Sequence, residues 1–119
     1  MPSVLRDSSS ELVKQISPVE LAAWLADKNR AAPLLLDVRE PWEHDKARIA
    51  GSQLVPMGQI QARIAELSKE NEVVAICHHG GRSLQIALYL EKNGFSRVHN
   101  LAGGIDAWSR TVDASVPLY

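Results

Sequence analysis

Short segments with the length of β-strands alternate along the chain with apolar stripes at helical spacing. The segments lie at 12–16, 34–36, 53–55, 73–76 and 97–101, and those at 34–36 and 73–76 are apolar throughout. The stripes predict helices that start after Ser17 and cover 57–69, 82–92 and 105–110, with a short helical turn at 40–44. Strands that alternate with helices are joined by right-handed crossovers. We therefore predict an α/β fold with an open, mainly parallel central sheet and helices on both faces.

The first predicted helix has complete start signals. Pro18 takes the first helical position, and Glu20 stands three residues after Ser17, which is the capping-box arrangement. Trp24 lies on the apolar stripe of this helix, so we expect it in the core. We also predict a core position for Trp42.

The stretch from 73 to 92 carries the candidate chemistry. The strand-like run 73–76 leads directly into Cys77, the only cysteine of the chain. His78, His79, Gly80 and Gly81 follow, and adjacent glycines favour a loop over a strand or a helix. A helix then begins near Arg82. The predicted order is strand, cysteine, glycine loop and helix.

A loop at the start of a helix gathers backbone N–H groups that have no partner within the helix. Anions are stabilised there, and Arg82 adds a positive charge, so both features favour the thiolate form of Cys77. Ser83 closes the predicted loop. The alternative is an inert core cysteine, the common fate of a lone cysteine. We favour the nucleophile because the two glycines and the arginine have no evident role around an inert residue.

Asp37 and Arg39 follow the run 34–36 at the predicted carboxyl end of a strand. Open α/β sheets place their functional sites at this edge. Asp37 can brace a loop by accepting backbone N–H bonds, or it can cap a local turn. We favour the bracing role and assign both residues to support of the active loop.

Composition narrows the class of protein. The 119 residues are 45% hydrophobic, which predicts a single domain over 11–119 behind a flexible arm at 1–10. A net charge of -1 does not favour nucleic acid as a partner. Neither a signal peptide nor a membrane span is predicted, and one cysteine fits a reducing compartment. We expect a cytoplasmic monomer, although a mature secreted chain would carry the same features.

Four blocks of the sequence resemble the single-domain members of the rhodanese family of sulfurtransferases. The blocks are Leu34–Glu40, His44–Ser52, the active loop Cys77–Ser83, and Leu101–Gly104 with Trp108 after it. One departure is that Ala47-Arg48-Ile49 stands where that family usually has glycine-histidine-isoleucine. This change affects local packing and leaves the cysteine loop intact.

The resemblance implies a rhodanese-like fold and a sulfur relay. Cys77 would accept a sulfane sulfur from thiosulfate or a persulfide, become a persulfide itself, and pass the sulfur to cyanide or a thiol. Arg82 would stabilise the departing sulfite through charge-assisted hydrogen bonds. A small thiol or a dithiol protein such as thioredoxin is the expected acceptor, and no cofactor is expected.

Three other functions deserve comparison. A phosphatase with a similar cysteine and arginine would have a loop one residue longer than the four residues between Cys77 and Arg82. A non-catalytic binding module would not need the cysteine. A metal site built from Cys77, His78 and His79 is disfavoured because adjacent residues rarely converge on one ion, and neither His44 nor His99 has ligand spacing to them. We therefore predict no metal. If protonated, His78 or His79 would add positive charge beside the cysteine.

Overall fold

The computed structural model describes residues 13–119. The arm predicted at 1–10, and Leu12 of the first predicted strand, lie outside the described residues. No helix in the described part of the chain is long and apolar enough to cross a membrane.

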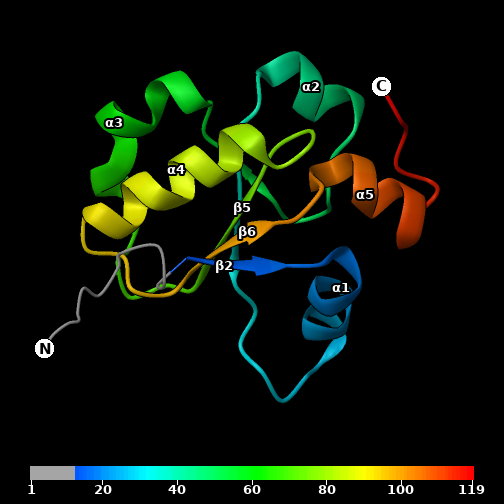
Figure 1. Cartoon of the computed structure of the whole chain (residues 1–119), viewed down its shortest axis with the longest axis horizontal. Helices are drawn as coiled ribbons and strands as arrows, with labels where there is room; N and C mark the ends of the chain where they lie inside the picture. The colour runs from blue at the N-terminus through cyan, green and yellow to red at the C-terminus, as the bar shows by residue number, and fades with distance from the viewer. Residues whose placement is uncertain (1–12) are drawn as a thin grey trace, which may run out of the picture.

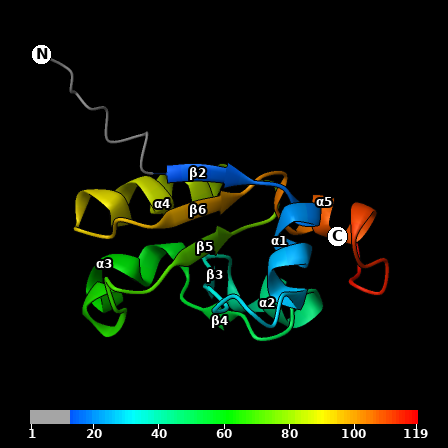
Figure 2. The ribbon, with the colours of Figure 1, turned by 90° about the horizontal axis from the view of Figure 1, so that it is seen from below.

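The described residues form one five-stranded sheet. Its order is β2-β6-β5-β3-β4, and each neighbouring pair is parallel, as Figure 2 shows. The strands are β2 (Val13–Ile16), β3 (Leu34–Asp37), β4 (Gln53–Leu54), β5 (Val73–Ile76) and β6 (Val98–Leu101). The strand that precedes the cysteine is therefore the central one, and its carboxyl end lies between those of β6 and β3.

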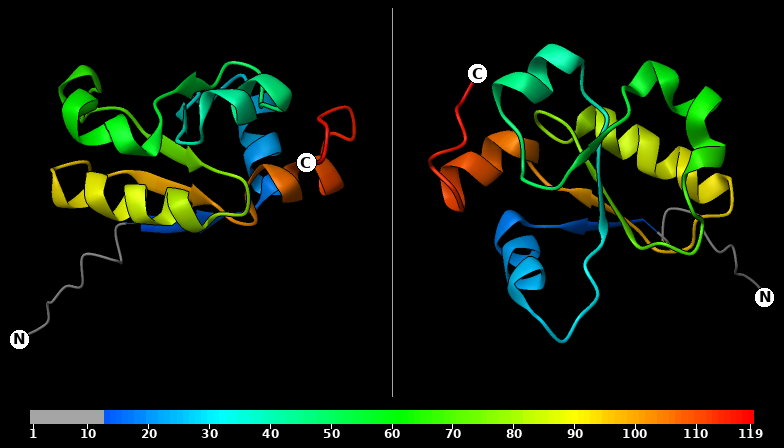
Figure 3. Two further views of the ribbon diagram at one scale, coloured as in Figure 1. Left: turned by 90° about the horizontal axis from the view of Figure 1, so that it is seen from above. Right: turned by 180° about the vertical axis from the view of Figure 1, so that it is seen from behind.

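Helices cover both faces of this sheet, which confirms the predicted α/β architecture. They are α1 (Pro18–Ala26), α2 (Pro41–Lys46), α3 (Ile60–Arg63), α4 (Gly81–Lys92) and α5 (Gly104–Thr111). Figure 1 shows α4 and α1 on opposite sides of the strands. The loop after β5 emerges between α2 and α5, as the view from behind in Figure 3 also shows.

Side chains of β5 alternate between two hydrophobic cores. Val73, Ala75 and Cys77 belong to the core beneath α3 and α4, and Val74 and Ile76 belong to the core beneath α1 and α5. The period of two along an extended chain places the cysteine on the α4 face. The sulfur atom is thus directed toward the beginning of α4.

The capping box of α1 forms as predicted. The Glu20 N–H donates to Ser17 Oγ at 3.1 Å, and the Ser17 N–H donates to Glu20 Oε1 at 2.8 Å. Trp24 is 2% exposed, as expected for a core residue.

The prediction that Trp42 lies in the core is wrong, because its side chain is 61% exposed. It stands on α2, a helix of only six residues whose buried face is used by Glu43. The aromatic ring instead contacts the edge of Tyr119, with ring centroids 5.7 Å apart. A short helix buries only one narrow face. In α2 the charged Glu43 occupies that face, so Trp42 beside it is exposed.

The single helix predicted over 57–69 is also wrong. The segment forms a 3-10 turn at Met57–Gln59, the short helix α3 and a second 3-10 turn at Ile64–Glu66. Ile60 and Leu67 are still buried at 1% and 7% exposure. Successive short turns can bury the same apolar residues, so the spacing did not require one continuous helix.

Candidate active site

Two main-chain N–H groups and one hydroxyl group lie around the sulfur of Cys77. The Gly80 N–H donates to Sγ at 3.1 Å, and the Ser83 N–H donates to it at 3.3 Å. Ser83 Oγ lies 3.2 Å from the same sulfur. Gly80 is the N-cap of the twelve-residue helix α4 and Ser83 lies in its first turn, where the helix dipole also favours negative charge. The structure brings Cys77, Gly80 and Ser83 together.

Gly80 makes this close approach possible. It caps α4 with a positive φ of 100°, which glycine adopts without strain. A Cβ at this position would also lie 3.3 Å from both the Gly103 N atom and the Leu101 carbonyl oxygen. The loop therefore turns tightly against the segment that follows β6.

The N-terminus of α5 holds the opposite side of the loop. The Ile105 N–H donates to the Cys77 carbonyl at 2.9 Å, and the Asp106 N–H donates to the His78 carbonyl at 3.1 Å. These bonds turn two carbonyl groups toward α5. A Cβ on Gly104, which has a φ of 62°, would overlap both carbonyl oxygens. The sequence did not predict this role of Gly104.

Asp37 and Arg39 form a buried ion pair at the end of β3, with side chains 1% and 0% exposed. Arg39 Nη2 lies 2.6 Å from Asp37 Oδ2, and the Arg39 backbone and Nε both donate to Asp37 Oδ1. Burial alone would raise the pKa of Asp37, but bonds from Arg39 and His44 outweigh it and lower that pKa. The pair stabilises the chain between β3 and α2.

Arg39 also holds the segment with Ala47-Arg48-Ile49, where the sequence departs from the pattern that it otherwise resembles. Its guanidinium donates to the carbonyls of Glu43 and Ala47. Ala47 and Ile49 are buried at 3% and 5% exposure, whereas Arg48 is exposed. The Arg48 side chain therefore lies on the surface and leaves the packing of its two neighbours intact.

A second ionic group connects this support to the active loop. Arg82 binds Glu43 through both terminal nitrogens, at 2.8 and 2.9 Å. The Tyr119 hydroxyl donates to Glu43 at 2.8 Å and accepts from Arg39 Nη1 at 2.7 Å. The bonds from Arg82 lower the pKa of Glu43 to about 2, and burial raises the pKa of Tyr119 to about 12. Glu43 is thus ionised and Tyr119 protonated near neutral pH.

The sequence placed Arg82 near the cysteine as a cation, and the structure pairs it with Glu43. Glu43 and Tyr119 were missed. Spacing gave no signal for them, because they lie 39 and 37 positions from Arg82. The sequence around Glu43 also gives little sign that this charged residue is buried, because its neighbour Trp42 is the residue expected to be in the core.

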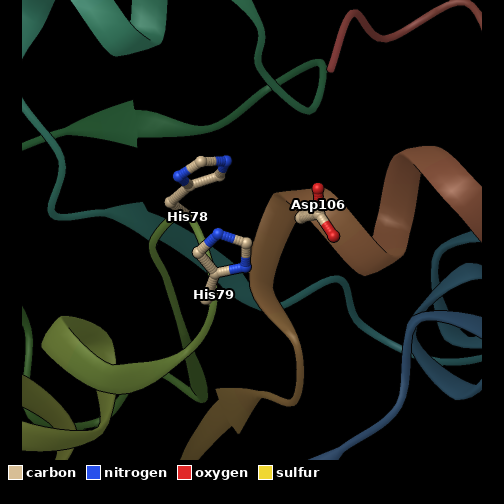
Figure 4. Close-up of side chains that lie close together, drawn as sticks. All are labelled: His78, His79 and Asp106. Carbon is tan, nitrogen blue, oxygen red and sulfur yellow. The ribbon is translucent and has the colours of Figure 1, made fainter. Parts of the chain in front are cut away.

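The rings of His78 and His79 stack beside Asp106, as Figure 4 shows. One ligand atom of each residue lies within 4.8 Å of the others. The two ring centroids are 4.0 Å apart with planes tilted by 33°, and His78 also stacks on Tyr119. Nitrogen lone pairs lie in the ring plane, so rings stacked in this way do not aim at one ion. The arrangement does not suit a shared metal.

Protonation of His78 is also disfavoured. Burial, followed by the nearby His79, lowers the pKa of His78. The hypothesis that His78 supplies positive charge beside the cysteine therefore loses support at neutral pH.

Asn100 on β6 is a third residue that sequence reasoning missed. Its side chain is 2% exposed and lies 2.5 Å from Ser83 Oγ. The sequence signal for it is weak, because Arg97 and His99 are also polar in the predicted strand 97–101, although a buried polar group needs a partner.

The sequence matches the rhodanese-like domain family over residues 17–111. It is 39% identical over 99 residues to a protein named sulfurtransferase from Allochromatium vinosum, covering 83% of this chain and 91% of that protein. A solved rhodanese-like domain protein from Staphylococcus aureus has a TM-score of 0.76 at 28% identity, covering 89% of this chain and 98% of that one. The chain therefore belongs to the rhodanese-like family, and its homologues include sulfurtransferases.

Some relatives are much longer. The chain is 37% identical over 117 residues to the rhodanese-like/PpiC domain-containing protein 12, chloroplastic, of Arabidopsis thaliana. That match covers 94% of this chain but only 39% of the Arabidopsis protein.

Gly104→Ala tests the contact between α5 and the active loop. The positive φ costs about 1–2 kcal/mol for a residue with a side chain, and overlap with two carbonyls adds about 1–3 kcal/mol. Gly51→Ala is the matched control, since Gly51 has a φ of 85° but open space around it. Urea denaturation should show the larger loss of unfolding free energy for Gly104→Ala. Equal losses would show that the contact contributes nothing.

Glu43→Gln tests the ionic group through pH. Because folding lowers the pKa of Glu43 from 4.5 to about 2, its stabilisation is complete above pH 4.5 and disappears as the pH falls toward 2. The effect should be roughly 2 kcal/mol, allowing for solvent around Arg82. Denaturation at several pH values should show a flatter profile for the variant. Glu66→Gln, at a surface pair with Arg63, is the control. A parental slope in Glu43→Gln would contradict the assignment.

Proposed function

We propose that this chain transfers sulfane sulfur through a persulfide on Cys77. The observation that supports this most is the set of donors around Sγ: two main-chain N–H groups within 3.3 Å at the start of α4. Such donors stabilise a negative sulfur in the same way that an oxyanion hole stabilises oxygen. The carbonyl groups that would repel it are turned toward α5.

The reaction would proceed in two displacements. The Cys77 thiolate attacks the outer sulfur of the donor, the donor's sulfur–sulfur bond breaks, and its electron pair leaves with sulfite or a thiolate. The proton of the Cys77 thiol goes to solvent. An acceptor thiolate or cyanide then attacks the terminal sulfur of the persulfide, and the Cys77 thiolate is released.

Burial of the nucleophile favours sulfur over phosphorus as the atom transferred. Cys77 is only 1% exposed, so a single outer sulfur atom can approach it more easily than a tetrahedral phosphoryl group. The short loop of four residues between Cys77 and Arg82 agrees with this choice.

For the donor, we propose thiosulfate or a low-molecular-weight persulfide. For the acceptor, we propose a small thiol or a dithiol protein such as thioredoxin, both of which a reducing compartment such as the cytoplasm supplies. Arg82 is 37% exposed and can contact an anionic donor at the mouth of the loop. Its pairing with Glu43 reduces the positive charge that the donor meets.

Cys77→Ser should abolish transfer because serine cannot form a persulfide. In the parent protein, intact mass after incubation with thiosulfate should rise by one sulfur atom, and cyanide should remove this gain and yield thiocyanate. The serine variant is the control and should gain no mass. A parent that takes up no sulfur from thiosulfate or from glutathione persulfide would favour a binding module instead.

Arg82→Ala and Glu43→Gln should change thiosulfate binding in opposite directions. Loss of the arginine removes a charged hydrogen bond of about 1.5–3 kcal/mol, so KM for thiosulfate should rise about tenfold or more. Loss of the Glu43 charge leaves Arg82 uncompensated, so KM should fall. Steady-state kinetics measures both values. A change in the same direction in both variants would indicate that they act by disturbing the loop rather than through charge.

A further inference from the structure

The orientation of the Asn100 side chain can be assigned from its partners. Its Nδ2 lies 3.1 Å from the Gly80 carbonyl and 3.0 Å from Gln15 Oε1. A carbonyl can only accept a hydrogen bond, so the amide nitrogen must face Gly80. The Asn100 Oδ1 atom therefore faces Ser83.

This orientation decides where the Ser83 proton lies. Ser83 Oγ is 2.5 Å from Asn100 Oδ1 and 3.2 Å from Cys77 Sγ. Asn100 Oδ1 has no hydrogen to give, so Ser83 must donate its single hydroxyl hydrogen to it. Only lone pairs of Ser83 Oγ are then left facing the sulfur.

We propose that Asn100 is a positioning residue that fixes the direction of the hydrogen bond between Ser83 and Cys77. With its own hydrogen on Asn100, the Ser83 hydroxyl accepts the thiol hydrogen of the resting cysteine. To donate to a thiolate, Ser83 would have to release Asn100 and leave a buried oxygen unpaired, which is costly. Asn100 thus opposes ionisation of the sulfur.

This opposition has a chemical use. The amides of Gly80 and Ser83 favour the thiolate, but nucleophilicity falls as a thiolate becomes less basic. A hydroxyl held as an acceptor balances these amides and keeps the sulfur basic enough to attack a donor.

Other charged and titratable groups surround the loop and are left unchanged in the experiment below. From α4, α2, α5, the loop and the C-terminal segment, they are Arg82, Glu43, Asp106, His78, His79 and Tyr119. The buried pair Asp37 and Arg39, with His44, comes from the end of β3 and from α2.

The test is the pH dependence of Cys77 alkylation by iodoacetamide. Asn100→Ala frees the Ser83 hydroxyl to donate to the thiolate, so the midpoint of the alkylation profile should move about one unit to lower pH. On the acid side this is about tenfold faster alkylation. Gln15→Ala removes the other partner of Asn100 but leaves its oxygen on Ser83, so its midpoint should equal the parent's. An unchanged or higher midpoint in Asn100→Ala would overturn the proposal.

Ser83→Ala provides the independent arm. If Ser83 accepts from the thiol, its removal leaves the midpoint at or below that of the parent; if Ser83 donates to the thiolate, the midpoint rises. In the Ser83→Ala background, Asn100→Ala should give no further shift, because the hydroxyl through which Asn100 acts is absent. A rise in Ser83→Ala, or an equal Asn100 shift in both backgrounds, would refute the proposal. Ser83→Ala decides the question by itself if thermal melts show that Asn100→Ala does not fold.

The inference concerns the same sulfur as the proposed function, but its readout is separate. Alkylation requires neither a sulfur donor nor an acceptor. A protein that shows the expected shifts but takes up no sulfur would refute the transfer and leave the role of Asn100 standing. A protein that transfers sulfur without the shifts would refute the role of Asn100 and leave the proposed transfer standing.

Discussion

The site depends on two hydrogen bonds from the N-terminus of α5 to the carbonyls of Cys77 and His78. A tight loop exposes N–H and C=O groups in close succession. The N–H groups stabilise a negative sulfur, whereas the C=O groups repel it. By binding the carbonyls, α5 leaves the amides of Gly80 and Ser83 free to face Sγ. Two helix N-termini thus act on one loop, with α4 facing the sulfur and α5 facing the carbonyls.

A chain of charged and polar side chains holds the same loop from the α2 side. It runs from the buried pair of Asp37 and Arg39 through the Tyr119 hydroxyl to Glu43 and then to Arg82. Each buried charge has an opposite partner, which offsets much of the cost of removing it from water. Arg82 belongs to the first turn of α4, so this chain connects the end of β3 with the helix that carries the donors.

Much of the fold could be predicted because it depends on local patterns. Segments of strand length identified the strands, and the order of Cys77, glycines and Arg82 placed the loop correctly between β5 and α4. Predictions failed where contacts between distant residues decide which side chains are buried. Trp42 is exposed because Glu43, which binds the distant Arg82, takes the buried position on a short helix.

Distant pairing was equally invisible in the sequence. The contact of Glu43 with Arg82 joins residues 39 positions apart, and that of Arg39 with Tyr119 joins residues 80 apart. Asn100 is one of three polar residues in the predicted strand 97–101, so the sequence did not single it out, and its contact with Ser83 depends on the register of β6 beside β5. The spacing of residues along the chain predicts neither these distant pairs nor the contact between Asn100 and Ser83.

The exposed Trp42 has a spectroscopic consequence. Its ring contacts the edge of Tyr119, whose own ring stacks on His78 with centroids 4.0 Å apart. The other two tryptophans, Trp24 and Trp108, are buried at 2% and 7% exposure. Trp42 is thus the indole whose emission responds to solvent and to the position of Tyr119, which makes it an intrinsic fluorophore for movement of the C-terminal segment over the loop.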